Sequence, residues 1–346
     1  MGDIAISLTN TSLWPAMARR LYRRAVVSGS IVLPAVPGML DEYVTMCDRV
    51  FTGIGVSFNG EQLGQLRRVL EGQLATAFAA SPRSDIVITY DSPTGLTVNY
   101  RVKAQWSSLE AAYDNWLSTR QPPLFGIEPD ARVWSLATAA ADPAAFPILD
   151  VGAGTGRNTL ALARRGHPVD AVEPAPKFAD GIRQEAGRES LPVRVIQRDI
   201  FITTDDLRRD YRLILLSEVA SDFRTADQLH GVFSLAAECL SPGGLLVFNA
   251  FVARNGYTPD DAARALAQQV YSTIFTREEI TAAAARLPLD LESDDSVYDY
   301  EKAHLPATAW PPTSWYEGWV SGQDVFDVPR EASPIEMRWL VYRKRG

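Results

Sequence analysis

The stretch that most constrains the fold is residues 148–173, where a short apolar segment leads into a glycine-rich turn. It begins Ile-Leu-Asp-Val-Gly-Ala-Gly-Thr-Gly-Arg-Asn, continues through an Ala/Leu-rich segment and ends in Val-Asp-Ala-Val-Glu. This order predicts a buried strand at 148–151, a turn at 152–156, a helix at 158–165 and a second strand at 169–172. In such a βαβ unit the tight turn lies at the carboxyl end of the first strand, where open α/β sheets place ligands.

The turn has glycine at every second position, which lets the backbone bend sharply and leaves no side chain between main chain and ligand: Gly152, Gly154 and Gly156. Glu173 ends the second strand, placed to accept hydrogen bonds from two ribose hydroxyls. The dinucleotide fingerprint G-x-G-x-x-G does not fit, because Arg157 stands where its last glycine belongs. Started two residues later, the fingerprint requires Gly or Ala at 159, where the chain has Thr159.

The spacing that is present, with Asp150 two residues before the first glycine, resembles motif I of class I S-adenosylmethionine-dependent methyltransferases. Later segments match that family in order: Arg-Asp-Ile at 198–200 after a third strand, Ser-Glu-Val at 217–219 after a fourth, and Pro-Gly-Gly at 242–244 before a fifth. A capping box with a hydrophobic staple at 275–280 and a final strand at 337–342 follow. The resemblance covers roughly residues 146–346.

The resemblance implies an α/β fold, the class I methyltransferase doubly wound seven-stranded sheet with its last strand antiparallel. We expect it to be preceded by an N-terminal α+β extension. The predicted organisation is an accessory region at 1–120, with helices and a β-hairpin at 86–102, then a connecting helix at 121–145. The S-adenosylmethionine-binding domain is predicted at 146–346, with an aromatic insert at 301–332.

By the same resemblance the cofactor is S-adenosylmethionine and the product S-adenosylhomocysteine. Motif I is implied to hold the methionine part and Glu173 the ribose. Asp199 and the amide of Ile200 are implied to meet the adenine, with Ser217 and Glu218 near the methionine end. The predicted cofactor-binding residues are Asp150, Gly152, Ala153, Gly154, Gly156, Asn158, Glu173, Asp199, Ile200, Ser217 and Glu218.

The family has no universal catalytic residue, because the cofactor carries its own leaving group and the protein's task is mostly positioning. Two side chains are candidates if the reaction needs a general base, Asp222 and His304. Many relatives carry a histidine at the position of Asp222, three residues after the Glu-Val pair. A solvated loop aspartate and a surface or packing histidine are the plainer interpretations.

Aromatic residues gather late in the chain, where three of the eight tryptophans fall within residues 310–319. They favour either a binding role, as a lid over a pocket for an apolar or aromatic acceptor or as a cage for a cation, or packing over the sheet edge as core. The side chains predicted to bind the acceptor are Tyr113, Trp116, Trp315, Tyr316 and Trp319.

Composition narrows the class of partner. A net charge of −8 disfavours nucleic acid as the main partner. The two cysteines stand in no metal-ligand pattern, so no metal is expected. The chain has no apolar run long enough to span a bilayer and no convincing signal peptide. We therefore expect no membrane partner and a cytoplasmic location. The sequence leaves open whether the chain forms a homodimer.

The sequence thus favours an enzyme that transfers a methyl group, to O or N of a small molecule ahead of carbon. A protein side chain as acceptor remains an alternative, as does a non-catalytic S-adenosylmethionine-binding regulator or scaffold. A nicotinamide-dependent dehydrogenase is disfavoured by Arg157 and Thr159. A closed aromatic cavity favours a small acceptor, whereas an open acidic groove favours a basic protein tail.

Overall fold

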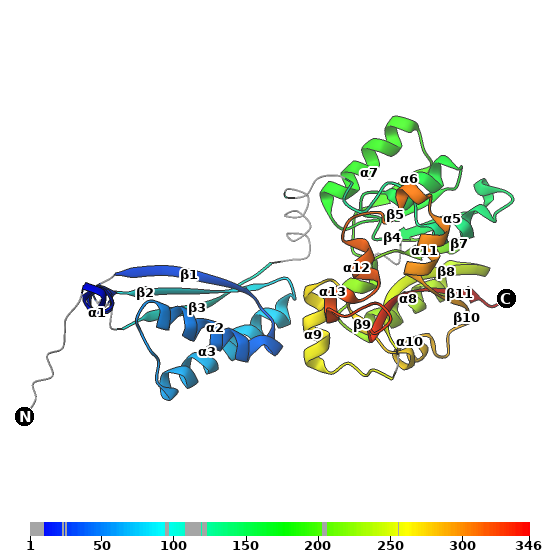
Figure 1. The fold of residues 1–346 in the computed structure, drawn as a ribbon. Helices are drawn as coiled ribbons and strands as arrows, with labels where there is room; N and C mark the ends of the chain where they lie inside the picture. Colours follow the sequence, from blue (N-terminus) through cyan, green and yellow to red (C-terminus); the bar gives the residue numbers. More distant parts are fainter. Residues whose placement is uncertain are drawn as a thin grey trace, which may run out of the picture. The chain divides into compact units, whose positions relative to one another are not determined.

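The computed structural model describes residues 10–22, 24, 26–93, 97–107, 119, 123–202, 206–254 and 256–346. The chain divides into two compact units, Met1–Leu109 and Glu110–Gly346, each treated by itself below (Figure 1).

The first unit is a three-stranded antiparallel sheet, in the order β1-β2-β3, packed against helices. Its core joins the apolar stripe of one helix, Leu66, Leu70 and Leu74, to inward side chains of the sheet. The strands predicted at 86–102 pair as expected. The remaining strand of this sheet, at 27–34, was not predicted, because Ser-Gly-Ser at 28–30 interrupts the alternation of apolar and polar residues. The elements are α1 (Asn10–Tyr22), β1 (Val27–Pro34), α2 (Leu40–Gly53), α3 (Gly60–Ala80), β2 (Asp85–Ser92) and β3 (Asn99–Gln105).

The second unit is built on an eight-stranded sheet with the order β10-β11-β8-β7-β4-β5-β6, and β9 pairs with β8 off this path. Neighbouring strands from β8 to β6 are parallel, whereas β11 runs antiparallel to both β8 and β10. The doubly wound sheet with an antiparallel last strand is therefore confirmed, and the two-residue β9 is an addition. The strands are β4 (Ile148–Val151), β5 (Val169–Val172), β6 (Val193–Ile196), β7 (Tyr211–Leu216), β8 (Leu240–Ala253), β9 (Ile274–Phe275), β10 (Leu289–Ser296) and β11 (Ile335–Lys344).

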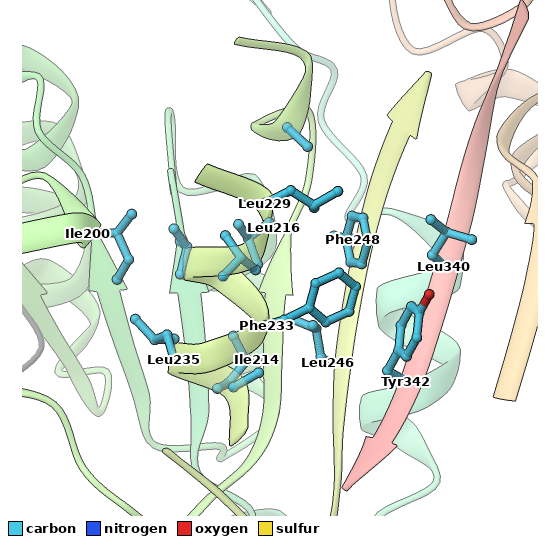
Figure 2. Packing of buried hydrophobic residues seen from close by; sticks show 14 of the residues in the cluster. Ile200, Ile214, Leu216, Leu229, Phe233, Leu235, Leu246, Phe248, Leu340 and Tyr342 are labelled. Atoms are coloured by element: carbon cyan, nitrogen blue, oxygen red, sulfur yellow. The ribbon is translucent and has the colours of Figure 1, made fainter. Parts of the chain in front are cut away.

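Helices cover both faces of this sheet, because alternate residues of its central strands point to opposite sides. On β7, Ile214 and Leu216 face one core, and Leu213 and Leu215 face the other. Figure 2 shows the first core, where Phe233 of α8 lies among side chains of β8 and β11. The helices are α5 (Ala131–Thr138), α6 (Arg157–Arg164), α7 (Pro176–Glu189), α8 (Ala226–Cys239), α9 (Asp261–Gln269), α10 (Arg277–Ala284), α11 (Val297–His304), α12 (Tyr316–Val320) and α13 (Gln323–Phe326).

The region between the last two long strands is more regular than the sequence indicates. The aromatic insert predicted at 301–332 contains α12 and α13, and the end of α11 reaches into it. Short helices of mixed aromatic and polar residues give no clear period, so their signal is weak. Within the described ranges, no helix is long and apolar enough to cross a membrane.

Helix α10 begins with the predicted capping box. The Thr276 hydroxyl accepts the Glu279 amide proton at 3.2 Å, and the Glu279 carboxylate accepts the Thr276 amide proton at 2.7 Å. Phe275 and Ile280 flank the cap and are both buried in the first core. The cap therefore fixes the chain entry between β9 and α10.

We predict that Thr276→Ala lowers the free energy of unfolding by about 1 kcal/mol, because it removes the acceptor for an otherwise unpaired helix amide. Urea unfolding followed by circular dichroism measures the loss. Thr281→Ala is the control, since its hydroxyl is exposed and binds only the carbonyl of its own helix at Arg277. An equal loss in both variants contradicts the capping account.

Candidate active site

The turn between β4 and α6 has a tightly bent backbone that requires glycine at three positions. Its glycines have φ of +69°, +54° and +82°, the left-handed region. A Cβ on Gly152 falls 2.4 Å from Val219 Cγ2, and one on Gly156 falls 2.9 Å from Ile182 Cγ1. A Cβ on Gly154 meets nothing nearer than the Phe125 ring at 3.8 Å. Packing thus excludes side chains at both ends of the turn, whereas at its middle an added Cβ makes only an ordinary van der Waals contact with the Phe125 ring.

Glu173 joins this turn to the end of β5. Its carboxylate accepts the amide protons of Gly154 and Ala175, each at 2.8 Å. The residue is only 5% exposed, and burial raises the pKa of its carboxyl group against the lowering effect of those two amides. Each carboxylate oxygen keeps a further lone pair, so the group can still accept two hydroxyl protons. This arrangement fits a ribose.

Asp150 faces the interior beneath the turn. It is 2% exposed, and the Thr159 hydroxyl donates to its Oδ2 at 2.5 Å. Burial raises the pKa of Asp150 to about 7, although Thr159 lowers it. The pair ties β4 to the first turn of α6. The neighbouring Ala153 is buried and its amide donates to the Val172 carbonyl at 3.2 Å.

The predicted adenine end lies after β6. The Asp199 carboxylate is exposed and accepts the amide proton of Phe201 at 2.8 Å, which closes a short turn. Ile200 is buried in the first core. The site residues at the ends of β4, β5 and β6 therefore all lie on the carboxyl edge of adjacent parallel strands.

Behind the turn lies a buried ion pair that the sequence analysis did not identify. Arg157 donates to Asp130 at 2.6 Å and to Glu218 at 3.2 Å, and its side chain is 7% exposed. Asn158 exchanges two hydrogen bonds with Asp130, at 2.8 and 2.9 Å. Arg157, the residue that breaks the dinucleotide pattern, was the available signal. Of its two partners, Glu218 was predicted for another role, near the methionine end of the cofactor, and Asp130, 27 positions away, carried no signal.

Two residues from the C-terminal part complete this cluster. Glu301 on α11 accepts the amide protons of Ala131 and Arg132 at 2.7 and 3.1 Å, and the Trp339 indole proton at 2.9 Å. The Tyr316 hydroxyl is buried and has no hydrogen-bond partner in the described part of the chain. Burial, aided by Asp130, raises the pKa of Glu301 to about 7. Burial and three nearby carboxylates raise the pKa of Tyr316 well above its ordinary value.

The end of β7 is strained and polar. Glu218 has φ of +62°, rare for a residue with a side chain. Its amide donates to Asn249 Oδ1 at 2.6 Å, and its carbonyl accepts from the Ser221 hydroxyl at 2.9 Å. The Ser217 hydroxyl and the Asn249 amide nitrogen are buried without a hydrogen-bond partner among the described residues.

The late aromatic residues pack mainly as core. Trp319 lies edge-on to Phe251 with 5.4 Å between ring centroids, and its indole donates to the carbonyls of Val270 and Tyr271. Trp315 is partly exposed and contacts the Trp319 ring at 5.4 Å. Packing, one of our two alternatives, thus describes Trp319 and the ring of Tyr316. Tyr113 and Trp116 lie outside the described residues.

The two candidate bases lie in different surroundings. His304 is exposed at the end of α11, where it stacks on Tyr300 at 4.2 Å and its Nδ1 lies 2.7 Å from the Tyr300 carbonyl. Asp222 is partly exposed at the end of the 3₁₀ turn Ala220–Asp222, which follows β7. Within the ranges that the structure describes, no group of three or more His, Cys, Asp or Glu could hold a metal ion.

Comparison with known proteins identifies the central segment. Residues 148–244 match the family model described as a methyltransferase domain. A search of curated proteins found no match to the chain. Solved structures similar to it include a geranyl diphosphate C-methyltransferase from Streptomyces coelicolor A3(2), in complex with S-adenosyl-L-homocysteine. It is 16% identical with a TM-score of 0.49, over 62% of this chain and 78% of that one.

Two further structures show the same level of likeness. The StiE O-MT is 21% identical with a TM-score of 0.44, over 62% of this chain and 73% of that one. The [4+2]-cyclase SpnF is 16% identical with a TM-score of 0.44, over 62% and 80%. At these identities and scores the likenesses bear on neither the reaction nor the acceptor of this chain.

We predict that Gly152→Ala lowers the free energy of unfolding more than Gly154→Ala. In both variants the left-handed backbone lowers the free energy of unfolding by about 1 kcal/mol. Only Gly152→Ala adds a steric clash, which costs a further amount of about 1–3 kcal/mol. Urea unfolding of both variants measures the difference. In a Val219→Ala background the excess cost of Gly152→Ala should shrink, because the clashing methyl group is gone. An unchanged excess contradicts the clash.

We also predict a pH effect from Asp150. Its folded pKa of about 7 lies above the ordinary 3.8, so its contribution to stability is full below about pH 4 and is lost as the pH rises to about 7. Asp150→Asn should flatten the fall in unfolding free energy between pH 4 and pH 8. The exposed Asp180→Asn should keep the wild-type slope. Equal slopes in wild type and Asp150→Asn contradict the assignment.

Proposed function

We propose that this chain, a class I S-adenosylmethionine-dependent methyltransferase by its domain at residues 148–244, transfers the methyl group to O or N of a small molecule. The bound cofactor supplies an activated methyl group on a sulfonium. The protein's own contribution is to hold the acceptor in line with that methyl group and to exclude water.

The observation that supports a small acceptor is the cover over the glycine turn. Phe125 lies above Gly154, and its ring centroid is 6.0 Å from that of Phe178. The next residue, Gly126, approaches so closely that a Cβ there falls 2.8 Å from Pro312 Cβ. The segment 124–126 therefore bridges the glycine turn and the aromatic segment at 310–316. A covered, aromatic edge suits a compact acceptor better than an extended basic tail.

For the cofactor we propose the roles that the fold makes possible. The backbone of the glycine turn holds the methionine part, and the remaining lone pairs of Glu173 accept the ribose hydroxyls. Asp199 and the amide of Ile200 hold the adenine. The unpartnered hydroxyl of Ser217 supports a polar contact near the methionine end.

We predict that the purified protein converts labelled S-adenosylmethionine to S-adenosylhomocysteine when given small molecules with O–H or N–H groups. The assay measures transfer of a tritiated methyl group to a panel of phenols, alcohols, carboxylic acids and amines, with a Lys/Arg-rich peptide beside them. Glu173→Ala, which removes the proposed ribose contact, is the control and should lose most of the transfer. Transfer to the peptide alone contradicts a small acceptor and indicates a protein methyltransferase.

A further inference from the structure

We propose that Glu218 is the residue that takes the proton from the acceptor, and that Arg157 and Asp130 position its carboxylate. This inference rests on the proposed function, because it concerns acceptors whose O–H or N–H loses a proton on methylation. It assigns the role to neither of the two bases expected from the sequence, Asp222 and His304.

The place of Glu218 in the fold is the first support. It is the second residue after the end of β7, and its neighbour Val219 packs on Gly152, so the carboxyl end of β7 lies against the glycine turn. Its side chain is 12% exposed, whereas that of Asp130 in the same cluster is 2% exposed. Of the two carboxylates that bind Arg157, Glu218 is therefore the more exposed.

The backbone supplies the second support. The left-handed conformation of Glu218 is unfavourable for a residue with a side chain and persists only where surrounding contacts hold it. Here Asn249 binds its amide and Ser221 binds its carbonyl, at 2.6 and 2.9 Å. Strain of this kind in a buried, doubly anchored residue is typical of functional sites. The anchors fix where the side chain leaves the main chain.

The charges around Glu218 suit a proton acceptor. The groups that face it are Arg157 from α6, Asp130 before α5, Glu301 from α11 and Tyr316 from α12. Burial raises the pKa of Glu218 to about 7, with Asp130 and Glu301 adding to the rise and Arg157 opposing it. Arg157 binds both carboxylates and lies nearer to Asp130 than to Glu218. Its charge is therefore shared between them and only partly compensates Glu218. A general base works best with a pKa near the working pH.

The step balances as follows. The acceptor's O or N forms a bond to the methyl carbon while the carbon–sulfur bond breaks, and that electron pair stays on sulfur as a thioether. The acceptor's proton passes to the Glu218 carboxylate, which then releases it to solvent through its exposed edge.

The test uses sinefungin, a cofactor analogue that carries an ammonium group in place of the methylsulfonium, beside S-adenosylhomocysteine, which has neither. If the Glu218 carboxylate faces the transferred methyl group, it forms a charge-assisted hydrogen bond with that ammonium. Calorimetry on the full chain should then show that Glu218→Gln weakens sinefungin binding about tenfold or more, while S-adenosylhomocysteine binding stays within about twofold. In the wild type, the preference for sinefungin should fall as the pH drops below about 7.

The outcomes separate the inference from the proposed function. Retained S-adenosylhomocysteine binding with an unchanged sinefungin preference in Glu218→Gln overturns the role of Glu218 alone. If Asp222→Asn instead selectively loses sinefungin binding, Asp222 is the carboxylate that faces the transferred methyl group, and the inference about Glu218 is overturned. If the wild type binds neither compound, the proposed function and this inference both fail. Should Glu218→Gln not fold, Glu218→Asp keeps the charge but withdraws it by one methylene, and the same selective weakening is expected.

Discussion

The candidate site depends on one buried cation. Arg157 is almost fully withdrawn from solvent and is shared between Asp130 and Glu218, which come from two other parts of the unit. A buried charge is tolerated only when it is paired, so these three residues constrain one another. The pairing fixes the chain before α5 and the end of β7 against the helix that follows the glycine turn. Removal of Arg157 leaves both carboxylates without their cation, typically at a cost of about 3–5 kcal/mol.

The sheet explains why the site forms where it does. Strand β4 pairs with β5 on one side and β7 on the other, so the strand order reverses beside the glycine turn. Open sheets bind ligands at such a point, outside the carboxyl ends of the strands. Glu173 ties the glycine turn to β5 at this edge. The same edge carries the strained end of β7, so the residues proposed to bind the cofactor and to take the acceptor's proton lie on one edge of the sheet.

The local parts of this arrangement were predictable from the sequence. The strand, glycine turn and helix at 148–165, the parallel core and the capping box at Thr276 all have short-range signals. What the sequence did not reveal depends on long-range contacts. Asp130 and Glu301 bind groups far away in the chain and have no distinctive neighbours. The density of tryptophans near residue 315 indicated importance without distinguishing a pocket wall from core, and the structure places Trp319 in the core.

The central claim is that the glycine turn and Glu173 form the S-adenosylmethionine site, and calorimetry tests it most directly. Titration of the wild type and of Glu173→Ala with S-adenosylmethionine should give micromolar-range binding that collapses in the variant, with both proteins folded by circular dichroism. Loss of the two hydroxyl contacts proposed for Glu173 would account for the change, since charged hydrogen bonds contribute about 1.5–3 kcal/mol each. A folded wild type that does not bind the cofactor, or an equal affinity in both proteins, contradicts the account.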